Sequence, residues 1–243
     1  MANIFPRGSN ILPLKILLCG LIAGGAVSLA VPYYFTPKYT RVGYQPAQPI
    51  PFPHDVHVAQ LGMDCRYCHS FVEVAAHSNV PTTQVCMNCH QSVQKDNPKL
   101  APLHESWRTG KPVEWVQIHK TPDYVYFNHS AHVNRGVSCV SCHGRVDKMA
   151  VVYHAEPHSM SWCLDCHRAP EKALRPVDQV TNLNWKAADV NVQTFMARNG
   201  QPPGDENTDF TKVKELTQEQ VGKTLRAKWH INPPDKNCAG CHR

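Results

Sequence analysis

Residues 126–143, YFNHSAHVNRGVSCVSCH, indicate the fold of the whole chain, because their pattern of histidines and cysteines recurs elsewhere in it. The stretch ends in CVSCH at 139–143, which has the spacing of a c-type haem attachment site. On one helical turn, two cysteines three positions apart can bond both vinyl edges of one porphyrin, and the histidine that follows can bind its iron. An iron held by one histidine has an open sixth position, and His129 and His132 are candidates to close it.

The attachment pattern C-x-x-C-H occurs five times, and we number the sites one to five in chain order: 65–69, 86–90, 139–143, 163–167 and 238–242. Sites one and three each follow an F-x-H-x-x-H pattern, FPHDVH at 52–57 and FNHSAH at 127–132. A further site follows each of them. The sequence therefore predicts two two-haem repeats, 51–90 and 126–167, and a fifth haem at 238–242.

Five copies favour haem attachment over the other uses of closely spaced cysteines. Zinc ribbons need C-x-x-C in pairs, and a disulfide framework would not place a histidine after every pair. We therefore expect five covalently bound haems c. The cysteines expected to bind them are Cys65, Cys68, Cys86, Cys89, Cys139, Cys142, Cys163, Cys166, Cys238 and Cys241. The histidines expected to bind the irons from the attachment side are His69, His90, His143, His167 and His242.

The distal ligands must come from the ten histidines outside the attachment sites. We expect His54 to bind the iron of site one and His129 that of site three, because each is the first histidine of its repeat. The second histidine of each repeat, His57 and His132, points a turn away, and we expect it to bind the iron of another site.

The fifth distal ligand is not determined by the repeat. The remaining candidates are His77, His119, His154, His158 and His230, of which we favour His77 and His119. Met160 lies three residues before site four, and a thioether ligand there would raise the reduction potential of the haem. Packing in the core is the commoner role of such a methionine.

Composition favours a haem-packed interior. The chain has 243 residues, room for one or two domains, with 20 prolines and little strand-like alternation. Five porphyrins would supply much of the core, so we expect short helices, long irregular connections and little sheet. The formal charge of +6 does not indicate nucleic acid binding, because the propionates of five haems would offset about five units of it.

The N-terminal stretch 11–35 is apolar except for Lys15 and is long enough to span a bilayer if that lysine reaches the surface. Arg7 and Lys15 predict that the N-terminal side stays in the cytoplasm. A cleaved signal peptide is the alternative, because residues 28–30, SLA, fit a cleavage site. We favour a retained anchor. A stripe of small residues would let it pack against another transmembrane helix: Gly20, Gly24 and Ser28.

These features divide the chain into a cytoplasmic N-terminus (1–10), a transmembrane anchor (11–35), a linker (36–50) and a pentahaem domain (51–243). Ten of the eleven cysteines lie in attachment sites, and covalent haem attachment takes place on the oxidising side of the bacterial membrane. We therefore expect a single-pass protein of the bacterial inner membrane, with the haem domain on the periplasmic side.

Residues 168–237 carry no attachment site but one clear helix signal. The residues TQEQ at 217–220 form a capping-box pattern, and the prolines at 233–234 stop a helix that starts there. The apolar residues that follow on one face are Val221, Leu225 and Trp229. We expect this region to cover haems or to contact a partner.

The two F-x-H-x-x-H…C-x-x-C-H stretches resemble the small multihaem cytochromes of class III, the c3 and c7 kind. The segments YVYFNHSAHVNRGVSCVSCHGRVDKM (124–149) and SMSWCLDCHRAPE (159–171), with the apolar N-terminus and the five sites, resemble the pentahaem subunit of alternative complex III. That complex is a bacterial respiratory quinol oxidoreductase that replaces the cytochrome bc1 complex.

The resemblance implies a mainly α-helical and irregular, class III-like multihaem cytochrome c fold with a haem-packed core and one N-terminal transmembrane helix. It also implies an electron-transfer subunit without catalytic residues, which relays electrons from membrane and iron–sulfur subunits to a cytochrome c or an oxidase. His154 and His158 beside Met160 depart from the pattern and leave the distal ligand of site four open.

A self-sufficient enzyme is the alternative, either a membrane-anchored multihaem quinol dehydrogenase or a periplasmic multihaem reductase of a small nitrogen or sulfur oxide. Catalysis at a haem needs a vacant iron position, whereas this chain has histidines enough to close all five. A single apolar helix also provides little material for a quinone pocket. We therefore favour the electron-transfer subunit.

Overall fold

The computed structural model describes residues 6–35, 40–234 and 237–242. The chain divides into two compact units, Met1–Val42 and Gly43–Arg243. The expected cytoplasmic segment 1–10 and linker 36–50 therefore lie partly outside the described residues. Backbone hydrogen bonds attach residues 43–44, which we expected in the linker, to the second unit: the Gly43 N–H donates to the His154 carbonyl at 2.8 Å, and the His154 N–H donates to the Tyr44 carbonyl at 3.0 Å.

The first unit consists of helix α1 (Leu12–Phe35), preceded by the 3-10 turn Arg7–Ile11. Within Gly8–Tyr34 an 18-residue stretch has a mean hydropathy of 2.1, and none of that stretch is buried. The expected apolar helix is therefore present. Its length and composition suit a membrane span, and an N-terminal signal sequence has the same properties.

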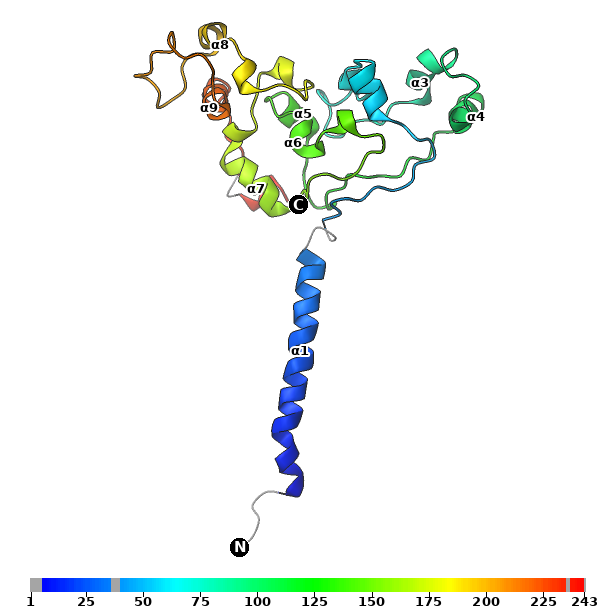
Figure 1. Ribbon diagram of the computed structural model, residues 1–243, viewed down its shortest axis with the longest axis vertical. Coiled ribbons are helices and arrows are strands. Elements are labelled where there is room, and N and C mark those ends of the chain that lie inside the picture. Colours follow the sequence, from blue (N-terminus) through cyan, green and yellow to red (C-terminus); the bar gives the residue numbers. More distant parts are fainter. Residues whose placement is uncertain (1–5, 36–39, 235–236, 243) are drawn as a thin grey trace. The chain divides into compact units, whose positions relative to one another are not determined.

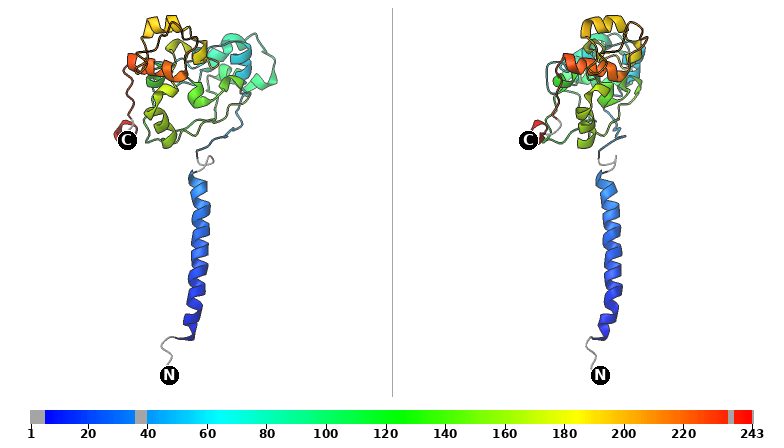
Figure 2. Two further views of the ribbon diagram at one scale, coloured as in Figure 1. Left: turned by 60° about the vertical axis from the view of Figure 1, so that its left-hand side comes forward. Right: turned by 90° about the vertical axis from the view of Figure 1, so that its left-hand side faces the viewer.

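The second unit is built from short helical segments joined by irregular connections, as Figures 1 and 2 show. Its helices are α2 (Cys65–Cys68), α3 (Thr83–His90), α4 (Ala101–Thr109), α5 (His129–Val133), α6 (Val140–His143), α7 (Met160–Arg168), α8 (Val192–Asn199) and α9 (Gln218–Lys228). Within the described ranges no strand forms, and β-type pairing is limited to the isolated bridges Val125–His242 and Val137–Leu174. The predicted mainly helical, sheet-free fold is confirmed.

Short polar residues begin most of these helices. Each accepts a hydrogen bond from a backbone N–H of the first turn, which would otherwise lack a partner. The residues that do so are Asp64 before α2, Asn128 before α5, Ser159 before α7, Asn191 before α8 and Thr217 before α9. At α9 the predicted capping box is present, with the Gln220 N–H donating to Thr217 Oγ1 at 3.2 Å and the Thr217 N–H donating to Gln220 Oε1 at 3.0 Å. The helix predicted at that position is confirmed.

The region after site four has an apolar core of its own. Its buried members are Leu174, Ala187, Val192, Phe195, Phe210, Leu216, Val221 and Leu225. Trp229 packs against this cluster, as the stripe on α9 predicted. The expectation that haems dominate the interior is therefore incomplete, because residues 174–231 bury their own side chains. A smaller cluster of Ile50, Met87 and Leu103 joins α3 to α4.

Candidate functional site

All five attachment patterns lie on helical turns: site one on α2, site two on α3, site three on α6, site four on α7 and site five on the 3-10 turn η8 (Cys238–Gly240). In the first, third and fifth sites the histidine N–H donates to the carbonyl of the first cysteine, at 2.8, 2.9 and 2.8 Å. The turn thus brings both cysteines and the histidine to one side of the backbone, as covalent haem attachment requires. All ten cysteines are free of disulfide bonds.

Six of the histidines proposed as iron ligands are oriented by backbone carbonyls. On the attachment side, Nδ1 of His69, His90 and His167 contacts the carbonyls of Asn79, Val93 and Pro234 at 2.7, 2.9 and 3.1 Å. On the distal side, Nδ1 of His57, His129 and His132 contacts the carbonyls of Pro53, Ala76 and Asn128 at 2.9, 2.9 and 2.7 Å. Because a carbonyl can only accept, Nδ1 carries the proton and Nε2 offers its lone pair to a metal.

Three pairs of rings face one another at the separation that a shared iron requires. The ring centroids lie 6.3 Å apart for His57 and His90, 6.4 Å for His129 and His143, and 6.1 Å for His132 and His167. With metal–imidazole bonds of about 2 Å on both sides, two axial imidazoles have ring centroids about 6 Å apart. The residues present therefore fit bis-histidine haem irons at sites two, three and four.

His54 and His69 complete the pattern at site one. The Nδ1 atom of His54 is buried and has no hydrogen-bond partner among the described residues. Burial, with a smaller contribution from the nearby His69, lowers the pKa of His54 to about 4. An imidazole that is buried, neutral and close to the attachment-side histidine is suited to bind metal.

Burial also keeps other proposed ligands neutral. It lowers the pKa of His129 and of His132 below the usual value, and that of His143 well below it. Neighbouring imidazoles add to the effect at all three. Since only the unprotonated nitrogen can bind iron, these environments favour the ligating form at neutral pH.

The phenylalanine of each repeat holds both of its histidines, a role that the sequence pattern contained but did not explain. Phe127 stacks on His132 with centroids 4.8 Å apart and meets His129 edge-on, also at 4.8 Å. Phe52 makes the same contacts in the other repeat. Its ring stacks on His57 with centroids 4.3 Å apart and meets His54 edge-on at 4.8 Å. Each ring therefore separates two imidazoles and fixes the directions in which they point.

The structure does not bring a second histidine against site five in its described part. Its histidine, His242, has the ring of Tyr124 at 5.7 Å. His77 is exposed, and His119 lies edge-on against His143 of site three at 4.4 Å. Met160 is 61% exposed, so the expectation that it packs in the core is wrong. Met160 begins α7, a helix with no buried residue in the described structure.

Two of the unassigned histidines lie in the interior beside site three. His154 is fully buried, and its ring lies 4.7 Å from that of His158. His158 donates from Nε2 to the Cys142 carbonyl at 2.9 Å, so this nitrogen is engaged by the backbone. The contact of His158 Nε2 with the backbone suits a structural role for this ring.

Comparison with known proteins gives two findings. The family described as cytochrome c7 and related cytochrome c matches residues 50–106 and 125–192, about half of the chain. The chain is also 40% identical over 100 residues to the menaquinone reductase multiheme cytochrome c subunit of Nitratidesulfovibrio vulgaris Hildenborough. That match covers 41% of this chain and 47% of the relative, so the chain spans about half the length of the relative it matches.

The matched ranges contain the first four attachment patterns and both F-x-H-x-x-H segments, whose rings face one another as described above. This protein therefore belongs to the family of cytochrome c7 and related cytochromes c, whose members carry covalently bound c-type haem.

Proposed function

We propose that this chain is the pentahaem electron-transfer subunit of a membrane-bound respiratory quinol oxidoreductase of the alternative complex III type. The proposal rests on the distances between imidazole ring centroids in three histidine pairs, which are 6.3, 6.4 and 6.1 Å. These are the separations expected for two imidazoles that bind one iron. Irons closed on both sides by histidine exchange electrons but offer no position to a substrate.

Haem supplies a reversible one-electron change at its iron. The chain supplies the ligands, and we assign them in pairs: His54 with His69, His57 with His90, His129 with His143, and His132 with His167. The backbone carbonyls that accept from Nδ1 hold six of these eight rings in place, so that little rearrangement accompanies a change of charge at the metal. For site five, His77 and His119 remain the proposed distal candidates.

Two features support a membrane location and partner subunits: the similarity to a menaquinone reductase subunit and the glycines on the surface of α1. The relative from Nitratidesulfovibrio vulgaris is a subunit of menaquinone reductase, which supports a quinone-linked complex. We propose membrane and iron–sulfur subunits as its partners. Helix α1 presents Gly20 and Gly24 on its surface with open space around them, so another transmembrane helix could approach closely. We propose a single-pass anchor in the bacterial inner membrane, a periplasmic haem domain and a cytochrome c or oxidase as acceptor.

A self-sufficient quinol dehydrogenase is the second candidate, favoured only by the absence of an assigned distal histidine at site five. Reduction by quinol distinguishes the two. The isolated chain, purified in mild detergent with its haems loaded, should be reduced by menaquinol slowly or not at all. Adding membranes that contain the partner subunits should restore rapid reduction. Rapid reduction of the isolated chain would contradict the proposal and favour the dehydrogenase.

The haem content provides a separate prediction. Five sites imply five covalently held haems, so the denatured chain should keep its colour and show a mass excess of five haems. Replacing Cys238 and Cys241 with alanine should remove one haem and leave four. An unchanged haem count in that variant would show that site five binds no haem. Site five is the sharpest test because no F-x-H-x-x-H pattern precedes it.

A further inference from the structure

We infer that the five attachment sites follow one another in space as a single unbranched line, in the order two, one, three, four, five. The inference rests on the proposed function and adds to it which sites are the two ends. It differs from the order along the chain, in which site one would be an end. Four separate sets of contacts carry it.

Sites two and one touch directly. Asn88, in the middle of the site-two pattern, donates from Nδ2 to the hydroxyl of Tyr67, in the middle of the site-one pattern, at 3.1 Å. On its other side α3 packs against α4, where Thr83 and Ser106 are hydrogen-bonded at 2.7 Å. Helix α4 carries no attachment site, so site two has one neighbouring site among the described residues.

Sites one and three also touch. The side chains of Cys65 and Cys139, the first cysteines of the two patterns, lie next to each other. The chain that leaves site one runs along α5: the carbonyl of Ala76 accepts from both the backbone N–H and Nδ1 of His129, each at 2.9 Å.

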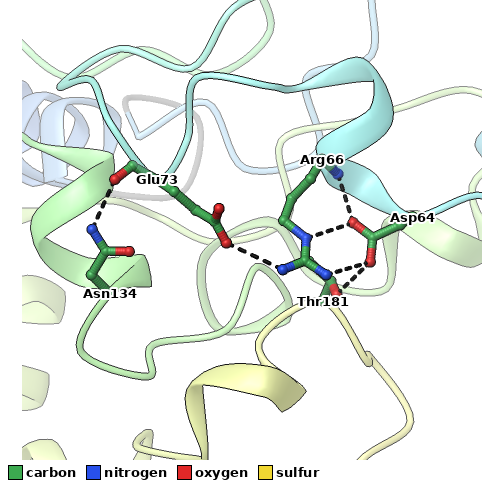
Figure 3. A network of polar contacts seen from close by, with 5 residues as sticks. All are labelled: Asp64, Arg66, Glu73, Asn134 and Thr181. Atoms are coloured by element: carbon green, nitrogen blue, oxygen red, sulfur yellow. Dashed lines mark hydrogen bonds and ion pairs between the residues drawn. The ribbon is translucent and has the colours of Figure 1, made fainter.

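Figure 3 shows how polar contacts fix this junction of sites one and three. Asp64, immediately before Cys65, accepts from Arg66 Nε at 2.9 Å and from Thr181 Oγ1 at 2.9 Å. Arg66 Nη1 reaches Glu73 Oε1 at 3.2 Å, and the Glu73 carbonyl accepts from Asn134 Nδ2 at 2.8 Å. The network therefore extends from the residue that caps α2 to the end of α5.

One short helix joins sites three and four. Helix α5 carries His129, which faces His143 of site three, and His132, which faces His167 of site four. Because the two ligands are three residues apart on one turn, the two metal positions must be close neighbours.

Sites four and five share Pro234. Its carbonyl accepts from Nδ1 of His167 at 3.1 Å, and a Cβ on Gly240 of site five would lie 2.9 Å from the Pro234 Cβ. The Tyr126 N–H donates to the Cys241 carbonyl at 2.8 Å, which fixes site five to the segment leading into α5.

The exposure of the attachment sites agrees with sites two and five as the two ends of the line. Among the attachment cysteines, Cys89 of site two and Cys238 of site five are exposed. The cysteines of sites one, three and four are all half-buried. The line therefore begins and ends at attachment sites that open to solvent, where partner proteins can approach.

The test injects electrons at site two of the full-length holoprotein. In a Cys19→Ser background, the exposed Lys95, five residues after His90, is replaced with cysteine and labelled with a ruthenium photosensitiser. Under illumination a tertiary amine supplies one electron, through the excited label, to each ferric iron that is reached. The fraction of haem reduced in the fast phase is read from the visible spectrum, at protein concentrations low enough to prevent transfer between molecules.

Two matched variants each lose one haem. Replacing Cys65 and Cys68 with alanine should confine fast reduction to the haem beside the label, one of four remaining. Replacing Cys238 and Cys241 with alanine should leave all four haems reducible in the fast phase. If the variant without site one still passes electrons to its other haems, the inferred order is overturned. If the five-haem parent passes no electrons beyond site two, the proposed relay itself is overturned.

A second measurement does not depend on deleting a haem. In His54→Ala all five haems remain, and the opened iron of site one should bind carbon monoxide once reduced. The gas should then block fast reduction beyond site two, and its removal should restore it. Unimpeded transfer in the carbon monoxide-bound protein would overturn the order.

Discussion

Replacing His129 with alanine is expected to convert one low-spin iron into a high-spin iron that binds carbon monoxide. The His129 ring lies parallel to that of His143, with an interplanar angle of 4° and centroids 6.4 Å apart, and no other described ring stacks in this arrangement with His143. Removal of one axial imidazole leaves the sixth position of the iron open. Electron paramagnetic resonance and carbon monoxide difference spectra should each report one altered haem.

Two further substitutions separate ligation from structural damage. His158→Ala removes a nearby imidazole whose Nε2 is bound to the Cys142 carbonyl, so the spectrum should stay low-spin. His129→Met offers a thioether instead, and should keep the iron six-coordinate while raising its reduction potential. If His129→Ala and His158→Ala give the same spectrum as the unaltered protein, the assignment of His129 is wrong.

The repeat pattern predicted much of the site because local spacing controls it. Two histidines three positions apart on one turn must point to different neighbours, and the structure shows His129 facing site three and His132 facing site four. The capping box at Thr217 predicted α9 for the same reason, since the residues that close its first turn lie within the turn itself.

The remaining features depend on contacts between segments far apart in the chain. The apolar core around Leu174 and Phe210 comes from irregular connections and short 3-10 turns, which leave no regular hydrophobic period to detect. The pairing of Val125 with His242 and the contact of Cys65 with Cys139 join distant residues. No spacing rule predicts them, and so the order of the sites in space could not be obtained from the sequence.

Gly136 is a position where a single added methyl group should damage the fold. It lies between the histidines of α5 and Cys139, with φ of +81°, and a Cβ there would overlap the carbonyl oxygen of Arg175. The backbone of Arg175 is also hydrogen-bonded to Gly136, because the Arg175 N–H donates to the Gly136 carbonyl at 3.0 Å. A Cβ would also lie 3.1 Å from the Trp229 ring, so the neighbouring residues on both sides would have to move.

Gly110→Ala is the matched control for Gly136→Ala. Gly110 ends α4 with φ of +72°, and nothing lies within 4 Å of its added Cβ. The free energy of unfolding of Gly110→Ala should therefore fall only by the cost of an alanine in left-handed geometry, about 1–2 kcal/mol. The free energy of unfolding of Gly136→Ala should fall by the same amount and by about 1–3 kcal/mol more from overpacking. Urea unfolding of the holoprotein, followed by the loss of low-spin iron, measures both. Equal losses would show that the segment around Arg175 yields freely and that the contact does not hold site three in place.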